Sequence, residues 1–159
     1  MIARDVLSGK LGEPDLGEIH ARGTWRAKMH VDLRAGRHDF VADEPPDRDG
    51  EDHGPTPLEY VLAGLCACEA VTMKRTADKM RMRIDSFAIE ANGVIDRRGR
   101  KGTAPVPAHF LRVEVRAKVG TPESEEKVQR LREVTERHCP VATLLQSAPL
   151  EFVSVWEKA

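Results

Sequence analysis

Three cysteines, Cys66, Cys68 and Cys139, are the residues of this sequence best suited to chemistry. A cysteine acts as a nucleophile through its thiolate, and a second thiol within reach can trap the oxidised product as a disulfide. Cys139 directly precedes Pro140, and proline favours the first turn of a helix. Cys139 is therefore expected at a helix N-cap, where unpaired backbone N–H groups favour the thiolate.

Cys66 and Cys68 fall within a predicted long helix, where a cysteine is either a reactive thiol or a small packing residue. With Leu58 as zero and about 100° per residue, Cys66 lies at about +80° and Cys68 at about −80° on the helical wheel. The two side chains flank opposite edges of the apolar stripe, so they cannot pair with each other in a regular helix. Either one could meet a cysteine from elsewhere in the chain.

The elements that must hold these cysteines follow from apolar periodicity and turn formers. Residues 21–43 alternate as two strands joined by a tight turn, and a loop rich in Asp, Gly and Pro follows them. A long helix is predicted from Pro57 to about Lys79. Thr56 and Glu59 form a Thr-x-x-Glu capping box at its start.

The rest of the chain continues the mixed pattern. Two strands are predicted over residues 82–95 and 108–118, helices over 121–138 and 141–146, and a last strand over 150–156. The resulting order, β-β-α-β-β-α-α-β, predicts an α+β fold. The first 20 residues are polar and glycine-bearing and are expected to form a loose N-terminal arm of a single domain that spans residues 1–159.

Composition excludes several classes of protein. Charged residues make up 32% of the chain, yet the net charge is only −1, so the basic footprint of a nucleic-acid binder is missing. No apolar run is long enough for a membrane span, and the N-terminal residues do not resemble a secretory signal. A cytoplasmic location is therefore expected, in which the cysteines begin as thiols.

A metal site is one alternative use of the cysteines. The three Cys and six His residues offer ligands, and His138 and Cys139 with Cys68 could form part of a site. Neither a Cys-x-x-Cys nor a His-x-x-x-His spacing occurs, however. The sequence therefore predicts no metal and no other cofactor.

The segment over residues 54–68, GPTPLEYVLAGLCAC, resembles the helix of the OsmC/Ohr family. That helix typically reads Gly-x-Asn-Pro-x-Glu, followed by an Ala/Leu run and a cysteine. The family cysteine comes twelve residues after the residue that precedes the proline, and counting from Thr56 leads to Cys68 rather than Cys66. Thr56 departs from the usual Asn, although either residue can cap a helix.

Two further segments are similar to OsmC-like sequences. His138-Cys139-Pro140-Val141 resembles the family's second motif, a Cys-Pro-Val that opens a short helix. The acidic and proline-containing residues 43–46 resemble a stretch that precedes the helix in one OsmC-like subgroup. The helix motif and the Cys-Pro-Val motif are specific as a pair.

The resemblance implies an intertwined homodimer, in which strands wrap two long central helices and the active sites lie at the subunit interface. It also implies reduction of organic hydroperoxides in oxidative stress defence. Cys68 would attack the peroxide, Cys139 would resolve the product as a disulfide, and a dithiol reductant would recycle it. Cys66 has no counterpart in the family pattern and is expected to be a packing residue or a spare thiol.

The same resemblance indicates how the attacking thiolate is activated. In the hydroperoxide-reducing branch an arginine from the N-terminal strands supports it, held by a glutamate directly after the helix proline. Arg34 and Arg37 lie in the matching region, but Leu58 stands at the glutamate position, and Glu59 comes one residue later. Glu59 could hold the arginine or only cap the helix. The departure keeps open a redox-sensing or small-ligand-binding dimer without efficient peroxidase activity.

Glu69 does not fit the apolar pattern of the long helix. At about 100° per residue it falls at about +20° from Leu58, inside the apolar stripe. A charge in that position needs a partner. The sequence predicts that Glu69 faces the active site or a dimer interface, or that the helix bends there.

Overall fold

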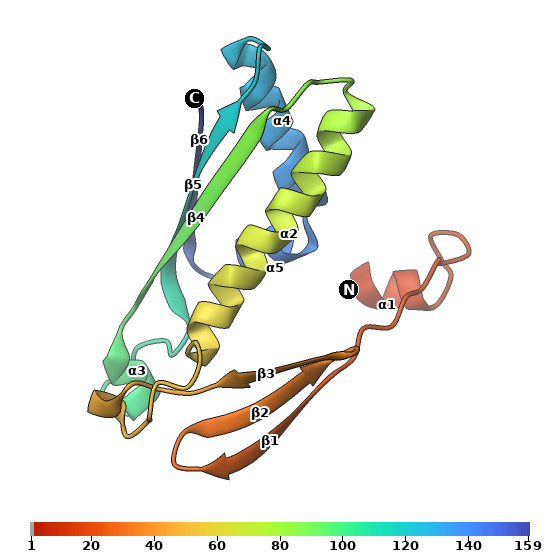
Figure 1. Ribbon diagram of the computed structural model, residues 1–159. Coiled ribbons are helices and arrows are strands. Elements are labelled where there is room, and N and C mark those ends of the chain that lie inside the picture. Colours follow the sequence, from red (N-terminus) through yellow and green to blue (C-terminus); the bar gives the residue numbers. More distant parts are fainter. Residues whose placement is uncertain (1) are drawn as a thin grey trace. The chain divides into compact units, whose positions relative to one another are not determined.

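The computed structural model describes residues 2–159 and divides the chain into two compact units, one ending at Thr56 and the other beginning at Pro57. The elements of both units are labelled in Figure 1. The first unit is a three-stranded sheet with short helical segments before and after it. The second combines a three-stranded sheet with the long helices, and it carries all three cysteines.

The first unit is an antiparallel meander in the order β1-β2-β3. Its elements are α1 (Ile2–Leu7), β1 (Ala21–Ala27), β2 (His30–Ala35), β3 (His38–Ala42) and the 3₁₀ turn η1 (Pro46–Arg48). Gly36, in the turn between β2 and β3, has φ +57°, a left-handed conformation that glycine adopts without strain.

This unit contains more structure than the sequence predicts. Residues 21–43 hold three strands rather than two, and α1 lies in the arm that was expected to be loose. The first predicted strand covers both β1 and β2, which are separated by a turn at Lys28 and Met29. Neither glycine nor proline marks this turn, although Lys28 has φ +46°, so the sequence pattern did not indicate it.

The second unit is a sheet with its long helices packed on one face, as Figure 1 shows. Its strands, in the order β4-β5-β6, are β4 (Ser86–Ile95), β5 (Phe110–Gly120) and β6 (Glu151–Lys158). Its helices are α2 (Pro57–Lys79), α3 (Arg97–Lys101), α4 (Glu125–His138) and α5 (Pro140–Gln146). β4 pairs with β5 antiparallel, whereas β5 and β6 are parallel, and α4 and α5 form the crossover that parallel pairing requires. The predicted α+β class is confirmed.

The inner face of this sheet forms the core. In β5 the residues from Val113 to Val119 alternate between buried and more exposed positions, so every second side chain there points toward the helices. Two apolar clusters result. One is centred on Leu131, Val119 and Trp156, and the other includes Leu65, Val115 and Cys139. The second cluster contains the reactive residues expected from the sequence.

We predict that Gly93→Ala destabilises the second unit. A Cβ atom at Gly93 would lie 2.4 Å from Cε1 of Phe110, whose side chain is buried in the cysteine-containing cluster. Forcing a core ring aside typically costs about 1–3 kcal/mol of unfolding free energy, which urea unfolding would measure. Asn92→Ala, on the exposed face of the same strand, is the control and should change stability by less than about 0.5 kcal/mol. Equal stability of the two variants would contradict the prediction.

Candidate active site

Two cysteines from distant parts of the sequence meet where α2 packs against the junction of α4 with α5. Cys68 lies on α2 and is half-buried, and it packs against the cluster that contains Leu65, Cys139 and Ala142. The thiol of Cys139 donates a hydrogen bond to Cys68, and this bond favours the protonated form of Cys139. Both residues are free cysteines. The structure thus brings together the pair that the sequence motifs indicate.

Cys139 is held in position by two helices at once. It is the C-cap of α4, where its backbone N–H donates to the carbonyl of Thr135 at 2.8 Å, and it is also the N-cap of α5. Pro140 occupies the first position of α5, as the sequence predicts. The backbone N–H of Ala142 donates to Sγ of Cys139 at 3.5 Å. These contacts fix the direction in which the thiol points.

The expectation that the helix start makes Cys139 a thiolate is wrong. Burial is the largest influence and raises the pKa of the Cys139 thiol to about 11. The N–H of Ala142 acts in the opposite direction, but the interaction with Cys68 raises the pKa further. Cys139 is completely inaccessible to solvent. The free-energy cost of burying a charge there outweighs the stabilisation of a thiolate by the start of a short helix. At neutral pH its thiol is protonated.

Cys66 has a different environment on the same helix. It is half-buried and, among the residues that the structure describes, it is not part of the apolar cluster around Cys139. Burial raises the pKa of its thiol, and the nearby carboxyl of Glu69 raises it further. A raised pKa disfavours the thiolate, so Cys66 is a poor candidate for the attacking residue.

Glu69, directly after Cys68, is an acid inside the protein. Its side chain has no solvent exposure, and neither carboxyl oxygen has a hydrogen-bond partner within residues 2–159. Burial raises its pKa to about 7; Glu136 adds to the increase, and Arg132 opposes it. Arg132 is itself paired with Glu136 at 3.1 Å. The partner that the sequence analysis required for this carboxylate is thus largely engaged elsewhere.

The other predicted site residues, Arg34, Arg37 and Glu59, precede Cys68 in the sequence and are not part of the cluster around Cys139. Arg34, on β2, directs Nη1 to both carboxylate oxygens of Asp39 at 3.3 Å, and Arg37 is exposed in the following turn. Both arginines belong to the first unit. Glu59 is exposed in the first turn of α2. Cys68 follows nine positions later, which corresponds to about 13.5 Å along the helix axis.

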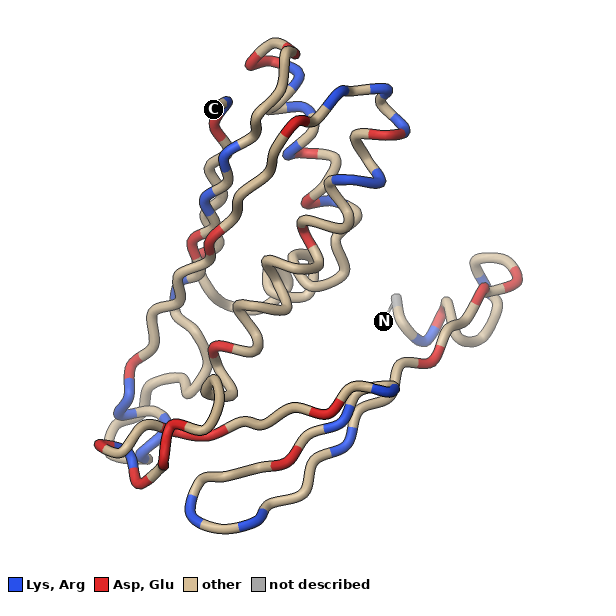
Figure 2. The backbone as a smooth tube through the Cα atoms, viewed as in Figure 1, with Lys and Arg blue, Asp and Glu red and all other residues tan. Residues whose placement is uncertain are grey.

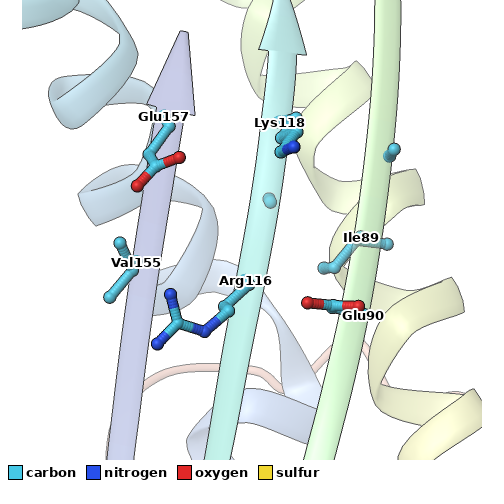
Figure 3. A pocket seen from close by; sticks show the side chains of 8 residues that line it. Ile89, Glu90, Arg116, Lys118, Val155 and Glu157 are labelled. Carbon is cyan, nitrogen blue, oxygen red and sulfur yellow. The ribbon is translucent and has the colours of Figure 1, made fainter. Parts of the chain in front are cut away.

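A hollow of about 500 Å³ lies away from the cysteines. Figure 3 shows Glu90, Arg116, Lys118 and Glu157 around it, on the face of the β4-β5-β6 sheet that does not carry the helices. The two cysteines lie in the core on the opposite face. The outer hollow is therefore no part of the candidate active site.

Comparisons with known proteins point to one family. The sequence model of the OsmC family, described as OsmC-like protein, matches residues 50–152. A search of curated proteins finds no match. No helix within residues 2–159 is long and apolar enough to cross a membrane.

Solved structures with the same fold share little sequence with this chain. An OsmC-like protein from Mycoplasma pneumoniae is 16% identical with a TM-score of 0.78, and the match covers 90% of this chain and 98% of that one. An organic hydroperoxide resistance protein OsmC from Legionella pneumophila is 15% identical with a TM-score of 0.69, covering 89% and 98%. The organic hydroperoxide resistance protein OhrB of Bacillus subtilis is 18% identical with a TM-score of 0.60, also covering 89% and 98%.

We predict that Glu69→Gln reduces the pH dependence of stability. The folded-state pKa of Glu69 is about 7 against 4.5 for the unperturbed group. Between these values the unfolded chain releases the proton first, so the stability of the wild type falls as the pH rises from about 4.5 to 7. At 1.36 kcal/mol per pKa unit the loss is about 3 kcal/mol.

Urea unfolding at pH 5 and pH 8 would measure this difference. Glu69→Gln should lose less unfolding free energy between the two pH values than the wild type does. The control, Glu126→Gln, replaces an exposed acid at the start of α4 and should behave as the wild type. An unchanged pH dependence in Glu69→Gln would show that the carboxyl is ionised in the folded protein.

Proposed function

Because the chain belongs to the OsmC-like protein family, we propose that it reduces organic hydroperoxides with two cysteines, in defence against oxidative stress. The observation that carries this proposal is the contact between Cys68 and Cys139 inside one apolar cluster. Two proteins of the same fold, from Legionella pneumophila and Bacillus subtilis, are organic hydroperoxide resistance proteins. The proposed setting is the cytoplasm, where a dithiol reductant keeps the cysteines reduced.

In the first step the thiolate of Cys68 attacks one oxygen of the peroxide. The S–O bond forms as the O–O bond breaks, and the released alkoxide takes up a proton and leaves as an alcohol. The peroxide is reduced, and Cys68 is oxidised to a sulfenic acid. Because burial raises the pKa of the Cys139 thiol to about 11, Cys139 is protonated at neutral pH and does not compete as the nucleophile.

In the second step the sulfur of Cys139 attacks the sulfenic sulfur of Cys68. A disulfide forms, and the hydroxyl group leaves as water with the proton from Cys139. The direct contact between the two side chains supports this step, because a disulfide requires Cβ atoms that are close together. An external dithiol then reduces the disulfide, and both thiols return. No metal or organic cofactor is needed.

The surroundings of the cysteines favour an organic peroxide. Half-buried apolar side chains surround the cluster that contains Cys139; they are Leu58, Leu62, Val141, Leu150 and Phe152, among others. An alkyl chain gains free energy by leaving water for such surroundings, whereas hydrogen peroxide has no apolar surface to bury. We therefore expect alkyl hydroperoxides to be better substrates than hydrogen peroxide.

Arg34 and Arg37 are the proposed cationic supports of the Cys68 thiolate, with Glu59 as the residue that holds the arginine. A guanidinium beside the sulfur would offset the cost of a negative charge in apolar surroundings. Arg34 is already paired with Asp39 in the hairpin. It would have to exchange this partner to serve the active site, so the exposed Arg37 is the more available of the two.

Leu58 favours a second candidate function, a redox sensor or small-ligand binder without efficient turnover. It stands at the position of the activating glutamate of the hydroperoxide-reducing branch, and here it is half-buried and packs against the cluster that contains Cys139. An apolar side chain cannot hold an arginine. In this alternative Cys68 and Cys139 still form a disulfide, but slowly, and its formation changes the protein's shape or its ligand affinity.

We predict that the wild type consumes an alkyl hydroperoxide with a dithiol reductant, that Cys68→Ser is inactive, and that Cys139→Ser loses activity progressively as Cys68 is over-oxidised. Peroxide consumption and thiol mass spectrometry would measure both effects. Cys66→Ser is the matched control on the same helix and should keep full activity. A wild type that forms the Cys68–Cys139 disulfide without turnover would support the sensor, and one that forms no disulfide would contradict both functions.

We further propose that the protein works as an intertwined homodimer. Within the described part of the first unit, Ala42 is the only apolar residue counted as buried, which is too little core for a unit of this size. On α2, Val61 and Val71 are exposed, and the stretch from Tyr60 to Cys68 carries no charge, as Figure 2 shows. A helix that is apolar beyond its sheet-facing side requires a second partner.

We predict that Val71→Glu weakens or abolishes the dimer, because it places a charge on the exposed apolar side of α2. Sedimentation velocity at several protein concentrations would measure the association. Val94→Glu is a matched control, since Val94 on β4 is 52% exposed and Val71 is 54% exposed, and it should remain dimeric. A monomeric wild type would overturn the proposed dimer while leaving the cysteine chemistry open to test.

A further inference from the structure

We propose that His30, Asp43 and His53 in the first unit form a binding site for a divalent transition metal ion, best suited to zinc. The proposal is independent of the cysteine chemistry. One ligand atom from each residue lies within 4.8 Å of the other two. Two imidazoles and a carboxylate are a donor set that zinc and related ions use in proteins.

Strand register and the following loop bring these residues together. His30 is the first residue of β2, and Asp43 directly follows β3. Val31 pairs with Ala42 in the antiparallel ladder, so the next position along the ladder sets His30 opposite Asp43. His53 comes from the loop after η1, which the backbone hydrogen bond from the N–H of Asp43 to the carbonyl of Pro55 draws back to the strand.

Two of the three distances between the ligand atoms fit a tetrahedral ion, and the third, between His30 and Asp43, is within 4.8 Å. Nδ1 of His30 and Nδ1 of His53 are 3.4 Å apart, and Nδ1 of His53 lies 3.3 Å from Oδ2 of Asp43. Two atoms that each bind a tetrahedral zinc ion at about 2.0–2.1 Å are about 3.3–3.4 Å apart. Both distances match the spacing of ligands around zinc.

The ring of His30 is oriented by a carboxylate, as is typical of histidines that bind metals. Its Nε2 lies 3.0 Å from Oδ1 of Asp32, and Arg26 holds the same carboxylate through Oδ2. The other ring nitrogen, Nδ1, faces His53 and is the atom that would meet the ion.

Asp43 is the rigid ligand of the cluster. Its side chain is only 1% exposed, and it accepts three backbone hydrogen bonds, from Glu44 to Oδ1 and from Glu51 and His53 to Oδ2. These backbone donors hold the carboxylate in place, with Oδ2 directed to the same side as Nδ1 of His53.

The site would remain open on one side. The side chain of His53 is 54% exposed, so water could supply a fourth ligand. Besides Asp32, Glu51 is a nearby acid, with Oε2 at 4.0 Å from Nδ1 of His53, but its Oε1 is paired with Lys28 at 2.8 Å. The ion would tie the end of β3 to the loop that leads into α2, in a unit with almost no apolar core.

Zinc titration of the purified full chain, after treatment with a chelator, tests the proposal. His53→Ala is the primary variant, because a half-exposed side chain can be removed without loss of the fold. It should bind one ion fewer per chain, or bind that ion at least about tenfold more weakly. His30→Ala should do the same, and Asp32→Asn, which changes only the orienting carboxylate, should weaken binding about 10–100-fold.

His38→Ala is the matched control, since it removes an exposed histidine from the same sheet, and it should bind zinc as the wild type does. Any zinc bound by the cysteines is the same in the wild type and in all these variants, so it does not contribute to the difference in zinc binding between them. The proposal is overturned if His53→Ala binds as many ions with the same affinity as the wild type. It is also overturned if His38→Ala loses as much binding as His53→Ala.

Discussion

The candidate active site depends on the contact between α2 and the junction of α4 with α5. Cys139 ends one helix and begins the next, and its thiol meets Cys68 because both helices pack on the same face of the sheet. The parallel pairing of β5 with β6 requires a crossover, and α4 and α5 provide it. The position of the reactive pair is therefore a consequence of the sheet topology.

The same packing creates an apolar site that disfavours charge. Cys139 stays protonated at neutral pH, and Glu69, one residue from Cys68, has a pKa of about 7. In the proposed mechanism a protonated Cys139 suits the resolving role, because it does not compete with Cys68 for the peroxide. The same apolar surroundings are the reason why the proposed mechanism calls for a cationic side chain near Cys68, and why Leu58 at the position of an acid favours the alternative function.

Much of the second unit could be predicted from local sequence. The capping residues around Pro57, the alternation in β5 and the Cys-Pro step at Cys139 each depend on neighbours within a few positions. These signals gave the long helix, the α+β class and the helix start at Cys139, whereas the resemblance to OsmC-like sequences indicated Cys68 rather than Cys66. They did not give the turn at residues 28–29 that divides one predicted strand into β1 and β2, because neither glycine nor proline marks it.

The sequence by itself indicated the candidate cysteines and the helix start at Cys139, because residue type and helix-start signals are local properties. The tertiary structure alone decided the protonation of Cys139, since burial by residues far along the chain outweighs the local effect of a helix start. It also decided the meeting of His30, Asp43 and His53, which have no regular spacing. A strand register and a returning loop join them, and such long-range pairings leave no periodic trace in the sequence.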